Sequence, residues 1–249
     1  MQRYRVRYTK EGRVRFVSAR DLTSVWERGL RRAGLPIAYS EGFSPHPKVS
    51  FPDALPVGYA STGEYAELTF AAPIDPGRGL GQLSATLPTG MDITTYVTVP
   101  DGARKLASYL KATLWELEFG PAEEAAELSH ELDARIAAVL AADTIEVVRH
   151  RPSGDKTLDV RPAIVAMASF LRGDAPQAAP VLRAVLRNDG PTIRPTDLEV
   201  ALARLGASAL PTVRRYRRVA QGDAVDGGLR EALTQQIEKL TPDRPAEAA

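Results

Sequence analysis

The chain has 249 residues, of which 44% are hydrophobic and 25% are charged, and its formal net charge is +1. These values are typical of a globular protein and exclude wholesale disorder. The sequence contains no cysteine, which excludes disulfides, thiol nucleophiles, and zinc or iron–sulfur sites with cysteine ligands. Only three histidines are present, so we expect no metal and no cofactor.

The N-terminal residues 1–8 alternate charged and apolar side chains, whereas a signal peptide needs an apolar run. No stretch reaches the ~20 apolar residues of a membrane-spanning helix. We therefore expect a cytoplasmic protein without a membrane partner.

The first hundred residues predict the element order β-α-β-β-α-β. The predicted elements are a strand at 3–8 that 14–17 extend or pair with, a helix from Ser18 to Gly34, a strand at 37–39, extended segments at 49–51 and 65–70, a weak helix at 75–87 and a strand at 93–99. Pro100-Asp-Gly102 marks a boundary. This order is the ferredoxin-like arrangement.

The same order is predicted again after the boundary. Its elements are a strand at 110–119, a helix at 121–142, a hairpin of 145–151 with 157–170, a strand at 181–187, a helix that starts at Pro195 and a strand at 212–219. A further helix is predicted at 225–240, before a frayed tail at 241–249. The sequence thus predicts an α/β (α+β sandwich) fold with two tandem ferredoxin-like domains, 1–102 and 103–222, and a C-terminal helix and tail, 223–249.

Positive charge is concentrated near the N-terminus. Residues 1–50 hold eleven Lys or Arg and four Asp or Glu, a balance of +7, so the remainder stands at −6. In the first helix the apolar stripe leaves the opposite side to arginines, which are Arg20, Arg28, Arg31 and Arg32. This pattern favours a basic surface for a polyanion or an acidic partner, and a solvated charged face is the alternative.

The segment Gly42-Phe-Ser-Pro-His-Pro-Lys48 is too rich in Pro and Gly for regular structure. Prolines on both sides of His46 stiffen the backbone that carries the imidazole. His46 and Lys48 are therefore candidates for gripping a phosphate or for general acid–base chemistry on RNA. A histidine that only bonds to backbone is the alternative, because one histidine makes no catalytic constellation.

A second basic segment is the predicted strand at 212–218. Alternation places Arg215 and Arg217 on one face, and Arg214, Tyr216 and Arg218 on the other. Arginines around an aromatic ring can hold phosphates and stack a base. An edge strand whose charges discourage aggregation is the alternative.

The run from Phe16 to Phe51, with Ala54-Leu-Pro-Val-Gly58 and Gly63-Glu-Tyr65, resembles the radical SAM-associated family of bacterial proteins of unknown function. The resemblance covers most of 3–220. Family members look like C-terminal extensions of a radical SAM protein or like free-standing chains associated with an RNase E/G-type ribonuclease. This sequence is similar to the free-standing form, since it lacks a cluster-binding cysteine motif. It departs from the family at Ala19, where a histidine is usual.

These observations favour an accessory protein that interacts with RNA beside a radical SAM enzyme or an RNase E/G-type ribonuclease. Two alternatives stay open. One is a metal-independent RNA-processing or RNA-modifying enzyme that uses His46 with Lys48 or Arg20. The other is a protein–protein scaffold whose arginines meet an acidic partner.

Overall fold

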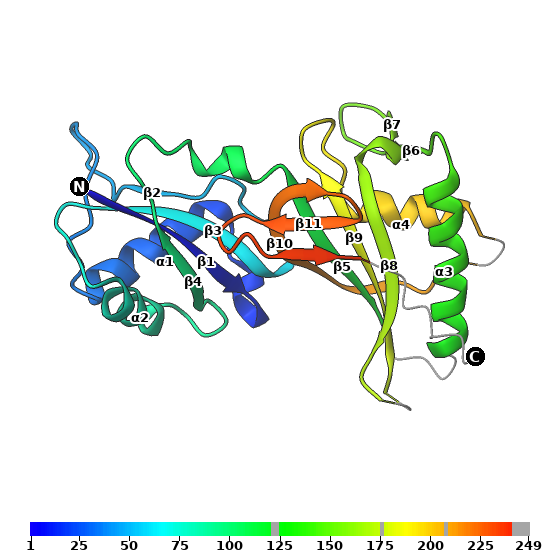
Figure 1. The fold of residues 1–249 in the computed structure, drawn as a ribbon, viewed down its shortest axis with the longest axis horizontal. Helices are drawn as coiled ribbons and strands as arrows, with labels where there is room; N and C mark the ends of the chain where they lie inside the picture. The colour runs from blue at the N-terminus through cyan, green and yellow to red at the C-terminus, as the bar shows by residue number, and fades with distance from the viewer. Residues whose placement is uncertain (121–124, 175–176, 207–208, 241–249) are drawn as a thin grey trace. The chain divides into compact units, whose positions relative to one another are not determined.

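The computed structural model describes residues 1–120, 125–174, 177–206 and 209–240 (Figure 1). The predicted tail at 241–249 and the first residues of the helix predicted at 121–142 lie outside this range. The chain divides into two compact units. Unit 1 holds Met1–Tyr109 with Ala232–Thr234, and unit 2 holds Leu110–Glu231 with the described residues from Gln235 onward. The division at 109/110 falls a few residues after the predicted boundary at 102/103.

Unit 1 is a sheet with two helices. Its elements are β1 (Gln2–Lys10), a 3-10 helix η1 (Gly12–Phe16), α1 (Ala19–Arg32), β2 (Val49–Ser50), β3 (Ala60–Phe70), α2 (Pro76–Thr86), β4 (Ile93–Thr98) and a 3-10 helix η2 (Leu106–Tyr109). The strands lie in the order β4-β1-β3-β2, and every neighbouring pair is antiparallel.

The core of unit 1 follows from two sequence periods. On β1 every second residue is apolar, and Tyr4, Val6 and Tyr8 are all buried. On α1 the stripe at helical spacing, including Trp26, is buried as predicted. The Trp26 ring lies edge-on to Tyr8, with ring centroids 4.9 Å apart, and to Phe51, at 5.5 Å. These aromatic contacts fasten α1 to the sheet.

Two short segments of unit 1 differ from the prediction. Residues 14–17 do not extend β1, because Gly12 adopts a φ of +58° and turns the chain into η1. The strand predicted at 37–39 is reduced to isolated bridges, Ile37 with Phe70 and Tyr39 with Pro47. Proline has no N–H to donate, which limits the ladder that this segment can form.

Unit 2 has the same order of strands with one insertion. Its elements are β5 (Ala112–Phe119), α3 (Ala125–Ala141), β6 (Glu146–Arg149), β7 (Lys156–Asp159), a 3-10 helix η3 (Arg161–Ala163), β8 (Ile164–Arg172), β9 (Ala179–Arg187), α4 (Pro195–Arg204) and β10 (Val213–Val225). Within the unit β10, β5, β9 and β8 are neighbours in that order, and all pairs are antiparallel. β6 and β7 form a separate two-stranded sheet.

With β6 and β7 set aside, both units place their last strand beside their first, then the third, then the second.

The hairpin predicted for 145–151 with 157–170 is only partly present. β7 ends at Asp159, and η3 turns the chain before β8 begins. Pro162 lies at the start of η3, where its missing N–H is not needed.

The helix predicted at 225–240 is wrong. β10 runs to Val225 and pairs with β11 (Gly228–Glu231), which pairs with β12 (Ile237–Lys239). Asp226-Gly227 forms the turn of a hairpin, with a φ of +64° at Gly227. A Cβ added at Gly228 would lie 2.1 Å from the carbonyl oxygen of Glu238, so only glycine fits there. Turn chemistry therefore gives a hairpin in place of the predicted helix.

No described helix is long and apolar enough to cross a membrane.

We predict that Gly90→Ala lowers the free energy of unfolding by about 2–4 kcal/mol. Gly90 has a φ of +91°, and a Cβ there would lie 2.5 Å from the carbonyl oxygen of Glu11. The control is Gly81→Ala in α2, where an added Cβ meets nothing within 4 Å. That change should stabilise the helix by about 0.5–1 kcal/mol. Thermal unfolding followed by circular dichroism compares the two, and equal effects would contradict the assignment.

Candidate nucleic-acid interface

The exposed face of α1 is lined by arginines. The helix begins where predicted, with Ser18 as its N-cap, and the Ser18 Oγ accepts the backbone N–H of Asp21 at 3.1 Å. Burial of the apolar stripe then fixes which side faces solvent. The arginines on that side are all exposed, namely Arg20, Arg28, Arg31 and Arg32.

Three of these arginines surround one shallow hollow. Arg28, Arg31 and Arg32 line a volume of about 270 Å³. Arg31 donates to the Glu27 carboxylate at 2.8 Å, and Arg32 donates to the carbonyl oxygen of Thr86 at 3.0 Å. Among the described residues, Glu27 is the only carboxylate within ion-pair distance of the three. The guanidinium groups around the hollow therefore concentrate positive charge at a surface that is open to solvent.

The loop at 42–48 is closed at its base by hydrogen bonds that backbone N–H groups donate. The Ser40 N–H donates to the His46 carbonyl at 2.8 Å, and the His46 N–H donates to the Ser40 Oγ at 3.0 Å. The Lys48 N–H donates to the Ala38 carbonyl at 2.7 Å. The side chains of Phe43 and His46 point to solvent and are exposed, and Lys48 is half-buried. The loop thus presents an aromatic ring and an imidazole from an anchored frame.

His46 has no acid–base partner in the described part of the chain. No hydrogen bond or ion pair to its side chain is formed there, and none joins the loop to the α1 arginines. The structure therefore does not bring His46 together with Lys48 or Arg20 as a catalytic group. A role of His46 in catalysis stays a prediction from the sequence.

Arg215 and Arg217 lie on one face of β10, as the alternation predicts. Opposite them on β5 lie Glu118 and Glu116 in direct register. The Arg217 Nη1 is 3.5 Å from the Glu116 carboxylate, and the Arg215 Nη1 is 3.9 Å from that of Glu118. The positive charges of Arg215 and Arg217 are therefore partly compensated by the carboxylates of β5.

Glu116 is the centre of a larger charged cluster. Its side chain is 3% exposed, and it accepts hydrogen bonds from Arg172 on β8 at 2.7 Å and from Arg183 on β9 at 2.9 Å. Arg172 also binds Glu118 at 2.8 Å. Burial by itself raises the pKa of Glu116, but the hydrogen bonds from Arg172 and Arg183 outweigh it and hold the pKa below its ordinary value.

Sequence reasoning missed Glu116 and Glu118. The signal was the alternation in Trp115-Glu-Leu-Glu-Phe119, which places both carboxylates on one face of a strand. A buried strand that carries two acidic residues on one face needs cations on its neighbours. Arg172 on β8, Arg183 on β9 and the arginine-rich segment at 214–218 supply them, but only the register shows which arginines pair.

We predict that Glu116→Gln lowers the free energy of unfolding by about 2–4 kcal/mol near neutral pH, because it removes the buried charge that Arg172 and Arg183 bind. The pKa of Glu116 is lower in the folded than in the unfolded protein. Its contribution to the free energy of unfolding is therefore present above the unfolded pKa of about 4.3 and is lost as pH falls through the pKa of the folded state. The difference between wild type and variant should therefore shrink in acid. Denaturant titrations from pH 3 to 7 measure it.

The control is Glu238→Gln. Glu238 also binds Arg183, at 2.8 Å, but its side chain is 40% exposed. We expect a cost of less than about 1 kcal/mol there. A Glu116 variant as mild as this control, or a difference that grows in acid, would contradict the role assigned to Glu116.

No group of three or more His, Asp or Glu side chains that could hold a metal ion occurs within the described ranges.

Comparison with known proteins gives one family. A search of curated proteins finds no match. A family model described as "Uncharacterized protein conserved in bacteria (DUF2344)" matches residues 3–195, which is well over half of the chain. The chain therefore belongs to this bacterial family.

Proposed function

We propose that the protein binds single-stranded RNA through unit 1, and that it acts as an accessory protein. The observation that carries the proposal is the hollow of Arg28, Arg31 and Arg32 on the exposed face of α1. Guanidinium groups held close together with one carboxylate among them repel one another, and a polyanion relieves that repulsion. RNA supplies phosphates at regular spacing and releases counterions when they are neutralised.

The loop at 42–48 supplies a second kind of contact. Phe43 is fully exposed although it is a large apolar residue. An exposed aromatic ring on an anchored loop suits stacking of an unpaired base, which contributes about 1–3 kcal/mol per base. His46 and Lys48 add polar contacts to phosphate. This combination of cations and an aromatic platform favours single-stranded RNA over a duplex.

Arg215 and Arg217 contribute less in this proposal. Each lies within ion-pair distance of a glutamate on β5, so part of its charge is already compensated. A phosphate at this face would have to compete with Glu116 and Glu118. The main RNA contacts are therefore assigned to α1, with the β10 arginines in a secondary role.

We further propose that each unit is a ferredoxin-like domain. The order of strands, last beside first and then third and second, supports this in both units. Domains of this kind occur in RNA-processing proteins, which is an argument from analogy. The resemblance of the Phe16–Phe51 run to radical SAM-associated proteins suggests the setting, which is a radical SAM enzyme or an RNase E/G-type ribonuclease as the protein partner.

The test uses the triple variant Arg28→Gln, Arg31→Gln and Arg32→Gln. Glutamine keeps the helix propensity of arginine while it removes the charge. We expect affinity for a fluorescein-labelled 20-nucleotide oligouridylate to fall by about tenfold or more at low salt. The slope of log K against log salt should become shallower by up to about 2, since each contact to a single strand contributes roughly 0.7.

The matched control removes three exposed arginines of unit 2, with Arg151→Gln, Arg187→Gln and Arg230→Gln. It changes the net charge by the same amount. If both triple variants lose the same affinity, RNA senses only the net charge and the α1 site is wrong. Tight binding that neither variant weakens would place the RNA elsewhere on the protein.

A further inference from the structure

The 3-10 helix η1 holds an aromatic ring at the surface just before α1. Phe16 is the last residue of η1 and is 58% exposed, although it is large and apolar. The backbone that carries it is fixed to unit 1, because Val14 is buried in the core and Val17 packs against the core. The Gly58 N–H also donates to the Arg15 carbonyl oxygen at 2.9 Å. The exposed ring therefore has an anchored support.

Two arginines of η1 accompany this ring. The Arg15 guanidinium lies over the Phe16 ring, 4.7 Å from its centre. Side chains three positions apart in a 3-10 helix are eclipsed, so Arg13 lies on the same side of η1 as Phe16. Among the described residues, no carboxylate lies within ion-pair distance of Arg13 or Arg15. Arg13, Arg15 and Phe16, the η1 cluster, thus combine an exposed ring with uncompensated positive charge.

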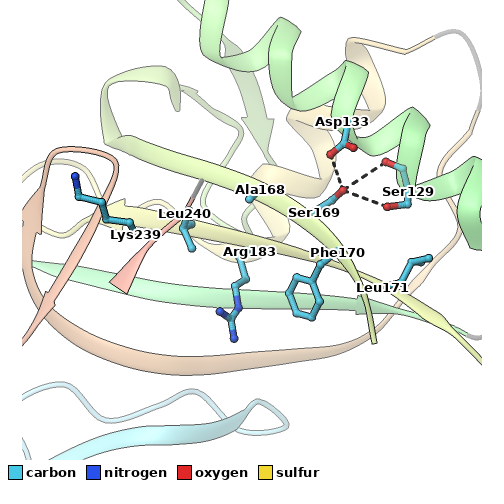
Figure 2. A pocket seen from close by; sticks show the side chains of 9 residues that line it. All are labelled: Ser129, Asp133, Ala168, Ser169, Phe170, Leu171, Arg183, Lys239 and Leu240. Atoms are coloured by element: carbon cyan, nitrogen blue, oxygen red, sulfur yellow. Dashed lines mark hydrogen bonds between the residues drawn. The ribbon is translucent and has the colours of Figure 1, made fainter. Parts of the chain in front are cut away.

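A larger hollow in unit 2 shows the opposite case (Figure 2). Its volume is about 630 Å³, and Ser169 and Arg183 are among the residues that line it. The Ser169 Oγ donates to the Asp133 carboxylate at 2.6 Å, and Arg183 is bound by Glu116 and Glu238. The protein itself pairs these groups. The cations of the η1 cluster, in contrast, are available to an anion from outside.

The exposed side of α1 leads from the η1 cluster toward the hollow of its arginines. Arg20, Ser24 and Arg28 are exposed and follow one another at intervals of four residues, which places them along one side of the helix. Among the described residues, no carboxylate lies within ion-pair distance of Arg20 either. A row of guanidinium and hydroxyl donors therefore runs along α1, whose 14 residues span about 21 Å.

A nucleotide matches the η1 cluster better than a purely apolar surface does. It supplies a flat ring and an anionic phosphate in one unit, and every base has a π-face that stacks on an aromatic ring. Arginines beside the ring can bind the adjoining phosphates. An apolar surface would cover Phe16 but would leave the guanidinium groups of Arg13 and Arg15 without a partner.

We propose that Phe16 stacks one unpaired base of a bound RNA strand while Arg13 and Arg15 bind the phosphates beside that base. The RNA site on α1 then extends past the N-terminal end of the helix and has a second stacking platform besides Phe43. This inference rests on the proposed binding of single-stranded RNA by unit 1.

The test compares two fluorescein-labelled probes, the 20-nucleotide oligouridylate and an abasic 20-mer with the same ribose–phosphate backbone. We expect Phe16→Ala to weaken binding of the oligouridylate by about 5–10-fold, measured by fluorescence anisotropy. Binding of the abasic probe should stay unchanged, because only a base can stack. Phe16→Tyr keeps an aromatic ring and should retain the affinity of the wild type. Phe16 is exposed, so thermal unfolding should show that both variants fold.

The matched control is Val57→Ala. Val57 is an apolar residue that is 55% exposed on the segment beside η1, but it has no π-face. Its removal should leave binding of the oligouridylate unchanged. If Phe16→Ala and Val57→Ala weaken binding equally, the patch is a general apolar surface and the stacking proposal is wrong.

The remaining outcomes separate this inference from the proposed function. If the triple variant of the α1 arginines loses affinity while Phe16→Ala does not, RNA binding by α1 stands and stacking on Phe16 is overturned. Equal loss on the abasic probe would also overturn stacking, since no base is present there. If the wild type does not bind the oligouridylate, both the proposed function and this inference fail.

Discussion

The negative charge of Glu116 allows three arginines to share one face of the unit 2 sheet. Its carboxylate lies nearly buried on β5, between Arg183 on β9 and Arg217 on β10, and Arg172 reaches it from β8. Without that charge the guanidinium groups would repel one another across strands less than about 6 Å apart. The carboxylate also limits how strongly these arginines can bind any other anion. An arginine that already binds a buried carboxylate gives up part of that bond to take a phosphate.

The same constraint acts on the basic N-terminal region. The charge of +7 over residues 1–50 includes Arg3 and Arg5 of β1, and both bind Glu67 of β3, at 3.3 and 2.8 Å. Arg3 and Arg5 are thus compensated by a carboxylate, as the arginines around Glu116 are, whereas among the described residues only Arg31 of the four α1 arginines binds one. The location of a cation in the fold, more than the net charge of its region of the chain, decides whether it can bind RNA.

This contrast explains what could be predicted from the sequence. On a helix the neighbours of a residue lie three and four positions away in the same chain, so the surroundings of Arg28 and Arg31 are visible in the sequence. The start of the helix at Ser18 and the buried stripe through Trp26 follow from the same local rules, and both are confirmed. On a sheet the neighbours come from distant segments. Nothing near Arg217 indicates that Glu116, about a hundred residues earlier, lies opposite it.

The error at 225–240 has a related cause. The segment was expected to be a helix, but Asp226-Gly227-Gly228 encodes a turn, and Gly228 meets the backbone of Glu238 too closely for any side chain. A long-range contact, the pairing of β11 with β12, therefore decides the structure of the segment. The neighbour that fixes this hairpin comes from another part of the segment, so local sequence periodicity does not reveal it.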